Sequence, residues 1–155
     1  MLGNTLDTRA EQGYRALLEA TAFGARVIVE TFRDSGVPVR EFVVAGGLLK
    51  NRQLMQLYSD VLRMPISTIA SDQGPALGSA IHAAVAAGAY PDVLAASERM
   101  GRVECNVYTN DPASSDTYDL LYEEYRLLHD YFGRGSNGVM KRLRQMRQTR
   151  QEVVA

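Results

Sequence analysis

The sequence has a single cysteine, Cys105, and no apolar stretch long enough to cross a membrane. One thiol cannot form a disulfide within the chain, and it has no C-x-x-C companion for zinc, so we expect a reduced chain with a small, packed, unligated thiol. A membrane span needs about 18 consecutive apolar residues, which no run approaches. The N-terminus also lacks a basic segment followed by an apolar one, so we expect a cytoplasmic protein without a membrane partner.

The sequence also lacks an excess of either charge. Its 17 basic and 18 acidic side chains give a formal net charge of −1, so nothing draws the whole chain to nucleic acid. Residues 134–155 are locally basic and carry no interleaved aromatic residues. We predict a basic helical tail there, solvated or paired with the acidic segment 116–124, and no nucleic-acid partner. The basic residues of the tail are Lys141, Arg142, Arg144, Arg147 and Arg150.

No group of residues has the spacing of a catalytic or metal site. His82 and His129 each lie in a helical pattern without a second His, Cys or carboxylate at ligand spacing, so both are predicted to be structural. No nucleophile, base and orienting group form a recognisable set. We therefore predict no metal ligand and no catalytic residue in this chain.

What the sequence does contain is an alternation of helix and strand patterns. Residues 8–34 carry apolar side chains on one helical face, and Gly36 and Pro38 end that helix. A strand "EFVVA" (41–45), a helix ending before Pro65, a strand "ISTIA" (66–70) and an alanine-rich helix stopped by Gly88 follow. The stripe on the first helix comprises Tyr14, Leu17, Leu18, Ala25, Ile28, Val29 and Phe32.

This order predicts an α/β fold with a parallel or mixed sheet: helix, strand, helix, strand, helix, then C-terminal helices. A short helix is indicated at 92–100, an extended piece ending in a polar loop at 103–116, and a tyrosine-striped helix from Tyr118 to Phe132. Two strands rarely form an independent sheet. We expect further strands from elsewhere, or self-association through exposed edges and apolar faces.

The junction "VVAGGLLKN" is the strongest local signal. Ligands in open α/β sheets bind beyond the carboxyl ends of strands, where a following helix offers free N–H groups. Gly46 and Gly47 remove both β-carbons there, and Asn51 can cap the next helix or direct its amide at a ligand. A tight structural turn with a capping asparagine explains the same residues equally well.

The segment "SDQGPALG" gives a second candidate helix start. Ser71 or Asp72 can act as the cap, and Asp72 or Gln73 can face a ligand. The interpretation that we favour is a helix cap followed by a small-residue packing face. That face comprises Gly78, Ala80, Ala84 and Ala87.

Together, "VVAGGLLKNRQLMQLYSDVLRMPI" and "ASDQGPALGSAIHAAVAAGAYPD" resemble the C-terminal part of the FGGY carbohydrate kinases, most closely those that phosphorylate L-ribulose. The resemblance covers roughly residues 8–132. It implies an actin and ribonuclease-H-like ATPase fold and ATP with Mg²⁺ as cofactors. It further implies that Gly46 and Gly47 receive the adenosine, that Asn51 contacts it, and that the "ALG" motif, 76–78, supports the nucleotide side. Leu48, Leu49 and Lys50 would line the turn.

The resemblance also implies what other parts of such a kinase provide. We expect the sugar pocket, the phosphate-binding turns and the aspartate base in an N-terminal domain and opening strands that this chain does not contain. The expected reaction is transfer of the γ-phosphoryl group of ATP to L-ribulose, giving the 5-phosphate. Xylulose, gluconate or glycerol as substrate, and a non-catalytic interaction module, remain alternatives.

Overall fold

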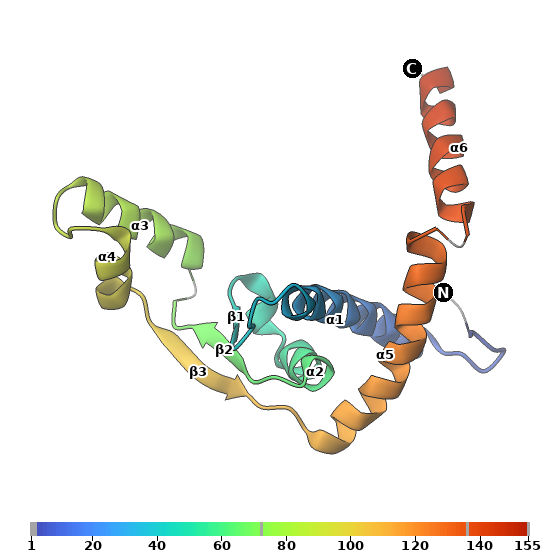
Figure 1. Cartoon of the computed structure of the whole chain (residues 1–155), viewed down its shortest axis with the longest axis horizontal. Coiled ribbons are helices and arrows are strands. Elements are labelled where there is room, and N and C mark those ends of the chain that lie inside the picture. The colour runs from blue at the N-terminus through green and yellow to red at the C-terminus, as the bar shows by residue number, and fades with distance from the viewer. Residues whose placement is uncertain (1–2, 72, 136, 155) are drawn as a thin grey trace. The chain divides into compact units, whose positions relative to one another are not determined.

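The computed structural model describes residues 3–71, 73–135 and 137–154, with side chains described as far as residue 148. The chain forms two compact units, Met1–Ser115 and Asp116–Ala155 (Figure 1). The predicted order of helices and strands is confirmed. The first unit contains α1 (Ala10–Asp34), β1 (Phe42–Val44), a 3₁₀ turn η1 (Gly47–Lys50), α2 (Arg52–Leu62), β2 (Ile66–Ile69), α3 (Gly74–Ala86), α4 (Val93–Met100) and β3 (Val103–Tyr108). Helix α5 (Pro112–Gly133) passes into the second unit, which ends with α6 (Val139–Val154).

The sheet is mixed and has the strand order β1-β2-β3. β1 and β2 are parallel, with Phe42 opposite Ile66, and β3 runs antiparallel to β2. The extended piece predicted after residue 102 therefore provides a third strand. Because β1 and β2 are parallel and adjacent, their carboxyl ends meet at one edge of the sheet.

Strand β3 is irregular opposite Ser67. Its pairing shifts register between Ile66 and Thr68, and Asn106 adopts a φ of +53° while its N–H donates to the Ser67 hydroxyl at 3.2 Å. The prediction that Cys105 is a packed side chain is wrong. β3 is exposed throughout 103–107, so nothing covers the thiol.

The core of the first unit lies between α1, α2 and the strand ends. Val29, Leu62 and Met64 form a buried cluster, against which Phe42 and Tyr58 pack. Burying an aliphatic side chain of this size contributes about 1.5–3 kcal/mol. The guanidinium of Arg26 donates to the carbonyl of Val61 at 3.0 Å, which also holds α1 against α2.

The apolar stripe predicted on α1 is only partly covered. Val29 is buried, and Leu18 and Ala25 are half-buried. The remaining predicted members, Tyr14, Leu17, Ile28 and Phe32, are exposed. The stripe is wider than the strip of α1 that packs against α2 and β1, which periodicity alone cannot reveal.

A buried carboxylate joins α2 to the segment that precedes α5. Asp60 is 7% exposed, and its Oδ1 accepts from the backbone N–H of Asp111 at 2.8 Å and from Nε2 of Gln56 at 2.9 Å. The hydroxyl of Ser115 donates to the carbonyl of Asp60 at 2.9 Å. These bonds fix the 109–115 connection on α2.

Helix α5 begins at Pro112, so the predicted polar loop through residue 116 is shorter than expected. Asp111 caps the helix, because its Oδ2 accepts from the backbone N–H of Ser114 at 2.9 Å, and proline suits the first helical position. The hydrogen bond from the Ser114 hydroxyl, followed in size by the one from the Ser114 backbone N–H, holds the pKa of Asp111 below its ordinary value of 3.8.

In the second unit, Tyr118 and Tyr122 of the predicted tyrosine stripe are buried. The rings of Tyr122 and Tyr125 stack at 6.2 Å, and His129 stacks on Tyr125 at 6.0 Å. His129 also contacts Asp130, and His82 on α3 is exposed. In the part of the chain that the structure describes, no helix combines the length and apolar character that a membrane span requires.

Candidate functional site

The two glycine-containing junctions of the sequence lie at the same edge of the sheet. β1 leads into Ala45 and Gly46, and the adjacent parallel strand β2 leads toward Gly74 at the start of α3. A β-carbon on Gly74 would stand 2.6 Å from Cδ1 of Ile69 and 3.9 Å from Cβ of Ala45. The start of α3 therefore lies against the ends of both strands, and a β-carbon on Gly74 would require the Ile69 side chain to shift.

Gly46 has a backbone conformation that glycine alone adopts readily. Its φ of +93° and ψ of −165° lie in a region that is strained for residues with a β-carbon. Its carbonyl accepts from the N–H of Leu49 at 3.2 Å, which starts η1. The turn thus needs a glycine at this position for its shape.

Gly47 has a different role, because it lies within η1 and is not among the glycines with positive φ. No atom lies within 4 Å of the place where its β-carbon would stand, and the same holds for Gly46. Both glycines are exposed, so the junction presents bare backbone to open space. A flat ring or an anion can approach such a surface closely.

Asn51 caps α2, one of the two roles considered for it. Its Oδ1 accepts from the backbone N–H of Leu54 at 3.0 Å, and its own N–H donates to the carbonyl of Leu48 at 3.0 Å. The side chain is exposed. In the described ranges its Nδ2 has no hydrogen-bond partner, so the amide can still donate outward while the oxygen caps the helix.

The charge at this edge favours an anion. The N-terminus of α2 carries a partial positive charge from its free N–H groups, and no acidic residue lies in the first turn of α2 or α3. Lys50 and Arg52 flank Asn51, and both are exposed. The edge can therefore bind a ligand that combines a flat body with negative charge.

The second junction differs in part from its prediction. The residue preceding α3 is Gln73, and the Ser71 hydroxyl accepts from the N–H of Gln73 at 3.1 Å instead of capping the helix. Asp72 lies outside the described residues. The predicted packing face of α3 is only partly covered: Gly78 and Ala84 are half-buried, whereas Ala80 and Ala87 are exposed. No atom lies within 4 Å of a β-carbon on Gly78. α3 packs against α4, a contact that the spacing of residues in the sequence does not predict.

Residues 1–87 match the model of the FGGY family of carbohydrate kinases, C-terminal domain. The chain belongs to this family. Gly46, Gly47, Asn51 and the "ALG" motif all lie within the matched segment of the FGGY chain. The family assignment expected from the sequence motifs is therefore confirmed, as is the α/β fold.

Individual relatives of this FGGY chain agree with the family assignment. It is 59% identical over 147 residues to a ribulokinase from Mycolicibacterium smegmatis, covering 95% of this chain and 26% of the relative. It is 50% identical over 152 residues to a ribulokinase from Shouchella clausii, covering 95% of this chain and 27% of the relative. The xylulose kinase structure from Rhodospirillum rubrum matches with a TM-score of 0.65 and 31% identity over 82% of this chain and 26% of that one. The chain thus spans about a quarter of the length of these relatives.

No group of three or more His, Cys, Asp or Glu side chains gathers into a metal site among the described residues. Asp60 is occupied by the hydrogen bonds that anchor the 109–115 connection. Sequence analysis did not identify Gly74 as the residue that joins the two junctions. The sequence signal for it is a glycine directly before Pro75 at a helix start, but its closeness to Ile69 depends on how the chain turns from β2 into α3.

Proposed function

We propose that this chain is the nucleotide-side segment of an ATP-dependent sugar kinase, and that the whole enzyme phosphorylates L-ribulose to L-ribulose 5-phosphate. The observation that carries the proposal is the exposed Gly46–Gly47 backbone at the carboxyl edge of a parallel strand pair, in a chain of the FGGY family. The choice of L-ribulose rests on the ribulokinases with 48% to 59% identity.

The residues present suit an adenine nucleotide. The space next to Gly46 and Gly47 would be occupied by β-carbons in other residues, and Asn51 retains a free amide donor beside it. We assign the adenosine to this surface and the polyphosphate to the side facing the N-terminus of α2. ATP with Mg²⁺ would supply the phosphoryl group, and the described residues gather no ligand set that would hold the metal themselves.

The role of this chain is then to bind and orient the nucleotide. In phosphoryl transfer, positioning and charge stabilisation provide most of the catalysis. The sugar site and the general base are proposed to belong to the remainder of the enzyme, since the chain corresponds to about a quarter of a ribulokinase. We therefore expect no kinase turnover from the 155-residue chain alone.

Nucleotide binding can be tested on the chain itself. Titration with ADP, followed by amide chemical shifts, is expected to perturb the signals of Gly46, Gly47 and Asn51. Gly47→Asp places a carboxylate on the proposed adenosine face and is expected to abolish these changes. Ala87→Asp, at an exposed position with ordinary backbone at the end of α3, is the matched control. Shifts confined to other regions would contradict the site.

The activity can be tested in a chimaera in which this chain replaces the matching segment of the Mycolicibacterium smegmatis ribulokinase. We expect turnover with L-ribulose, and a Gly47→Asp chimaera with a KM for ATP raised far more than the KM for the sugar. Equal effects on both would count against a nucleotide-side role. Preference for xylulose, gluconate or glycerol over L-ribulose would keep the kinase and overturn the sugar assignment.

A further inference from the structure

The groups assigned so far to the nucleotide surface do not distinguish one purine from another. Gly46 and Gly47 present backbone, and the carbonyl of Gly46 already accepts from the N–H of Leu49. Asn51 uses Oδ1 to cap α2, so its Nδ2 donor is the part of the amide that remains for a ligand. Adenine and guanine both carry ring-nitrogen acceptors, but adenine has an amino donor at C6 where guanine has a carbonyl. A side chain that selects adenine at this position must therefore accept a hydrogen bond as well as donate one.

Gln73, the residue that precedes α3, lies next to this surface. A β-carbon on the following residue, Gly74, would stand 3.9 Å from Cβ of Ala45, and Ala45 directly precedes Gly46. Consecutive Cα atoms are about 3.8 Å apart, so Gln73 and Gly46 are each one residue away from that contact. Both follow the carboxyl ends of the adjacent parallel strands β1 and β2, within the first unit. Gln73 is therefore placed beside a ligand that rests on the two glycines.

The side chain of Gln73 is available to such a ligand. Its backbone is held on both sides, because its N–H donates to the Ser71 hydroxyl at 3.1 Å and its carbonyl accepts from the N–H of Leu77 at 2.9 Å. The side chain is exposed and makes no cap hydrogen bond to α3. A glutamine amide offers an acceptor oxygen and two donor hydrogens, whereas Lys50 and Arg52, the exposed cations at the same edge, can only donate. Gln73 thus adds an acceptor to an edge whose other assigned side chains donate.

We propose that Gln73 determines the base specificity of the nucleotide site. Its Oε1 accepts from the 6-amino group of adenine, and its Nε2 donates to the adjacent ring nitrogen. A glutamine amide matches adenine through these two bonds, whereas the 6-carbonyl of guanine would face Oε1 with no proton between the two oxygens. The inference rests on the proposed function, because it requires adenosine at Gly46 and Gly47. It makes Gln73 the side chain that selects ATP over GTP.

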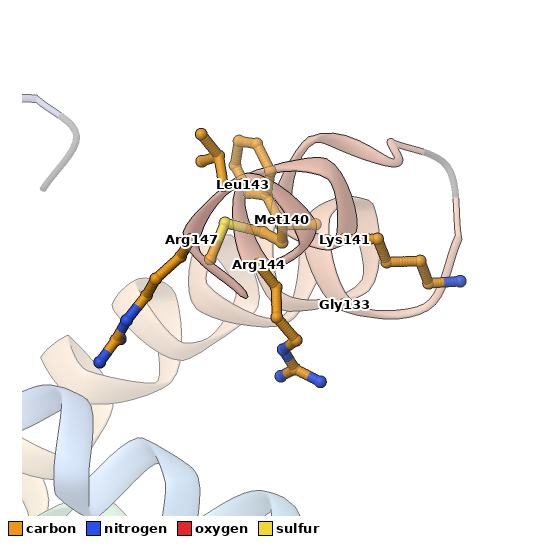
Figure 2. A pocket seen from close by; sticks show the side chains of 7 residues that line it. Gly133, Met140, Lys141, Leu143, Arg144 and Arg147 are labelled. Carbon is orange, nitrogen blue, oxygen red and sulfur yellow. The ribbon is translucent and has the colours of Figure 1, made fainter. Parts of the chain in front are cut away.

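A second surface of the chain also suits a nucleotide, but without base selection. The second unit contains a groove of about 460 Å³ where α5 ends and α6 begins (Figure 2). Its lining is apolar and cationic, and comprises Phe132, Gly133, Met140, Lys141, Leu143, Arg144 and Arg147. None of these side chains carries an oxygen that could accept from an amino group. Binding in the groove should therefore not distinguish ADP from GDP, which separates it from binding beside Gln73.

The test compares ADP, GDP and inosine diphosphate, whose base has the 6-carbonyl of guanine without its amino group. Each is titrated into the 155-residue chain and followed by amide chemical shifts. The wild type is expected to bind ADP about tenfold more tightly than the other two, the lower part of the range for a bidentate amide–base pair. Gln73→Met keeps the length of the side chain and removes both polar atoms. It should lose about tenfold in ADP affinity and keep its GDP affinity, so that the preference disappears.

Matched controls separate this contact from other effects. Gln53→Met, at an exposed glutamine in the first turn of α2, should keep the preference for ADP, as should Arg144→Ala in the groove of the second unit. ADP shifts at Gly46 and Gly47 with the same preference in wild type and Gln73→Met would overturn the role of Gln73 while the nucleotide site stands. A wild type that binds all three nucleotides equally at the glycines would do the same. Absence of ADP shifts at both glycines would overturn the nucleotide site and this inference together.

Discussion

Replacing Gly46 and Gly47 one at a time with alanine should distinguish a glycine needed for the backbone conformation of the turn from a glycine needed for nucleotide binding. At Gly46, φ of +93° with ψ of −165° lies in a region that costs about 1–3 kcal/mol for a residue with a β-carbon. At Gly47 the backbone is ordinary and a β-carbon meets no atom within 4 Å. Alanine there adds no strain and restricts the unfolded chain, which is worth about 0.4–1 kcal/mol of added stability.

We therefore expect Gly46→Ala to be less stable than Gly47→Ala by about 1–4 kcal/mol, the sum of these two effects. Urea unfolding followed by circular dichroism at 222 nm measures this difference, with equal slopes as the check that the unfolded states match. The ADP affinity of Gly47→Ala should fall although its stability does not. Its methyl group occupies the proposed adenosine face, while the protein remains folded. Equal stabilities would refute the backbone argument, and unchanged ADP affinity in Gly47→Ala would refute the close approach of the ligand.

Three further predictions concern side chains that hold this unit together. Asn51→Ala should lose about 1 kcal/mol by removing the cap of α2, whereas Asn51→Ser should retain most of it; thermal unfolding compares them. Asp60→Ala leaves two donors without their acceptor and should cost about 3 kcal/mol in urea unfolding, whereas Asp60→Asn keeps an acceptor oxygen and should cost clearly less. The lowered pKa of Asp111 contributes stability that is present above its ordinary value of 3.8 and is lost as pH falls through the lower folded value. Wild type and Asp111→Ala should therefore converge in stability on acidification, and a constant gap would contradict this role.

The elements and the candidate edge could be predicted because both depend on local signals. Strand patterns, helix stripes and Gly36 or Gly88 as stop signals are properties of neighbouring residues. The pairing of two consecutive strands joined by a helix then brings their carboxyl ends together. Gly46, Gly47 and Asn51 could thus be proposed for one site without knowledge of any side-chain contact.

The features that sequence analysis missed depend on contacts between distant residues. A β-carbon on Gly74 would stand 2.6 Å from Cδ1 of Ile69 and would require that side chain to move, a proximity set by how β2 leads into α3. Cys105 is exposed because no described element covers β3 over residues 103–107. Asp60 is buried because the 109–115 connection crosses α2 and takes its carboxylate as an acceptor. No periodicity in the sequence encodes any of these distances.

None of the three residues that the proposed function assigns to this edge is titratable. This determines which kinetic constants a substitution at the edge can change. Gly46 and Gly47 carry no titratable group, and Asn51 contributes an amide, so none of them can exchange a proton with a substrate. The helix N-terminus beside them acts through fixed dipoles that do not change with pH. In the chimaeric enzyme, substitutions at these positions should therefore change the KM for ATP and leave the pH dependence of kcat unaltered. A shifted pH profile in the Gly47→Ala enzyme would mean that this edge acts on the proton-transfer step, which would require a titratable partner beyond the three residues assigned here.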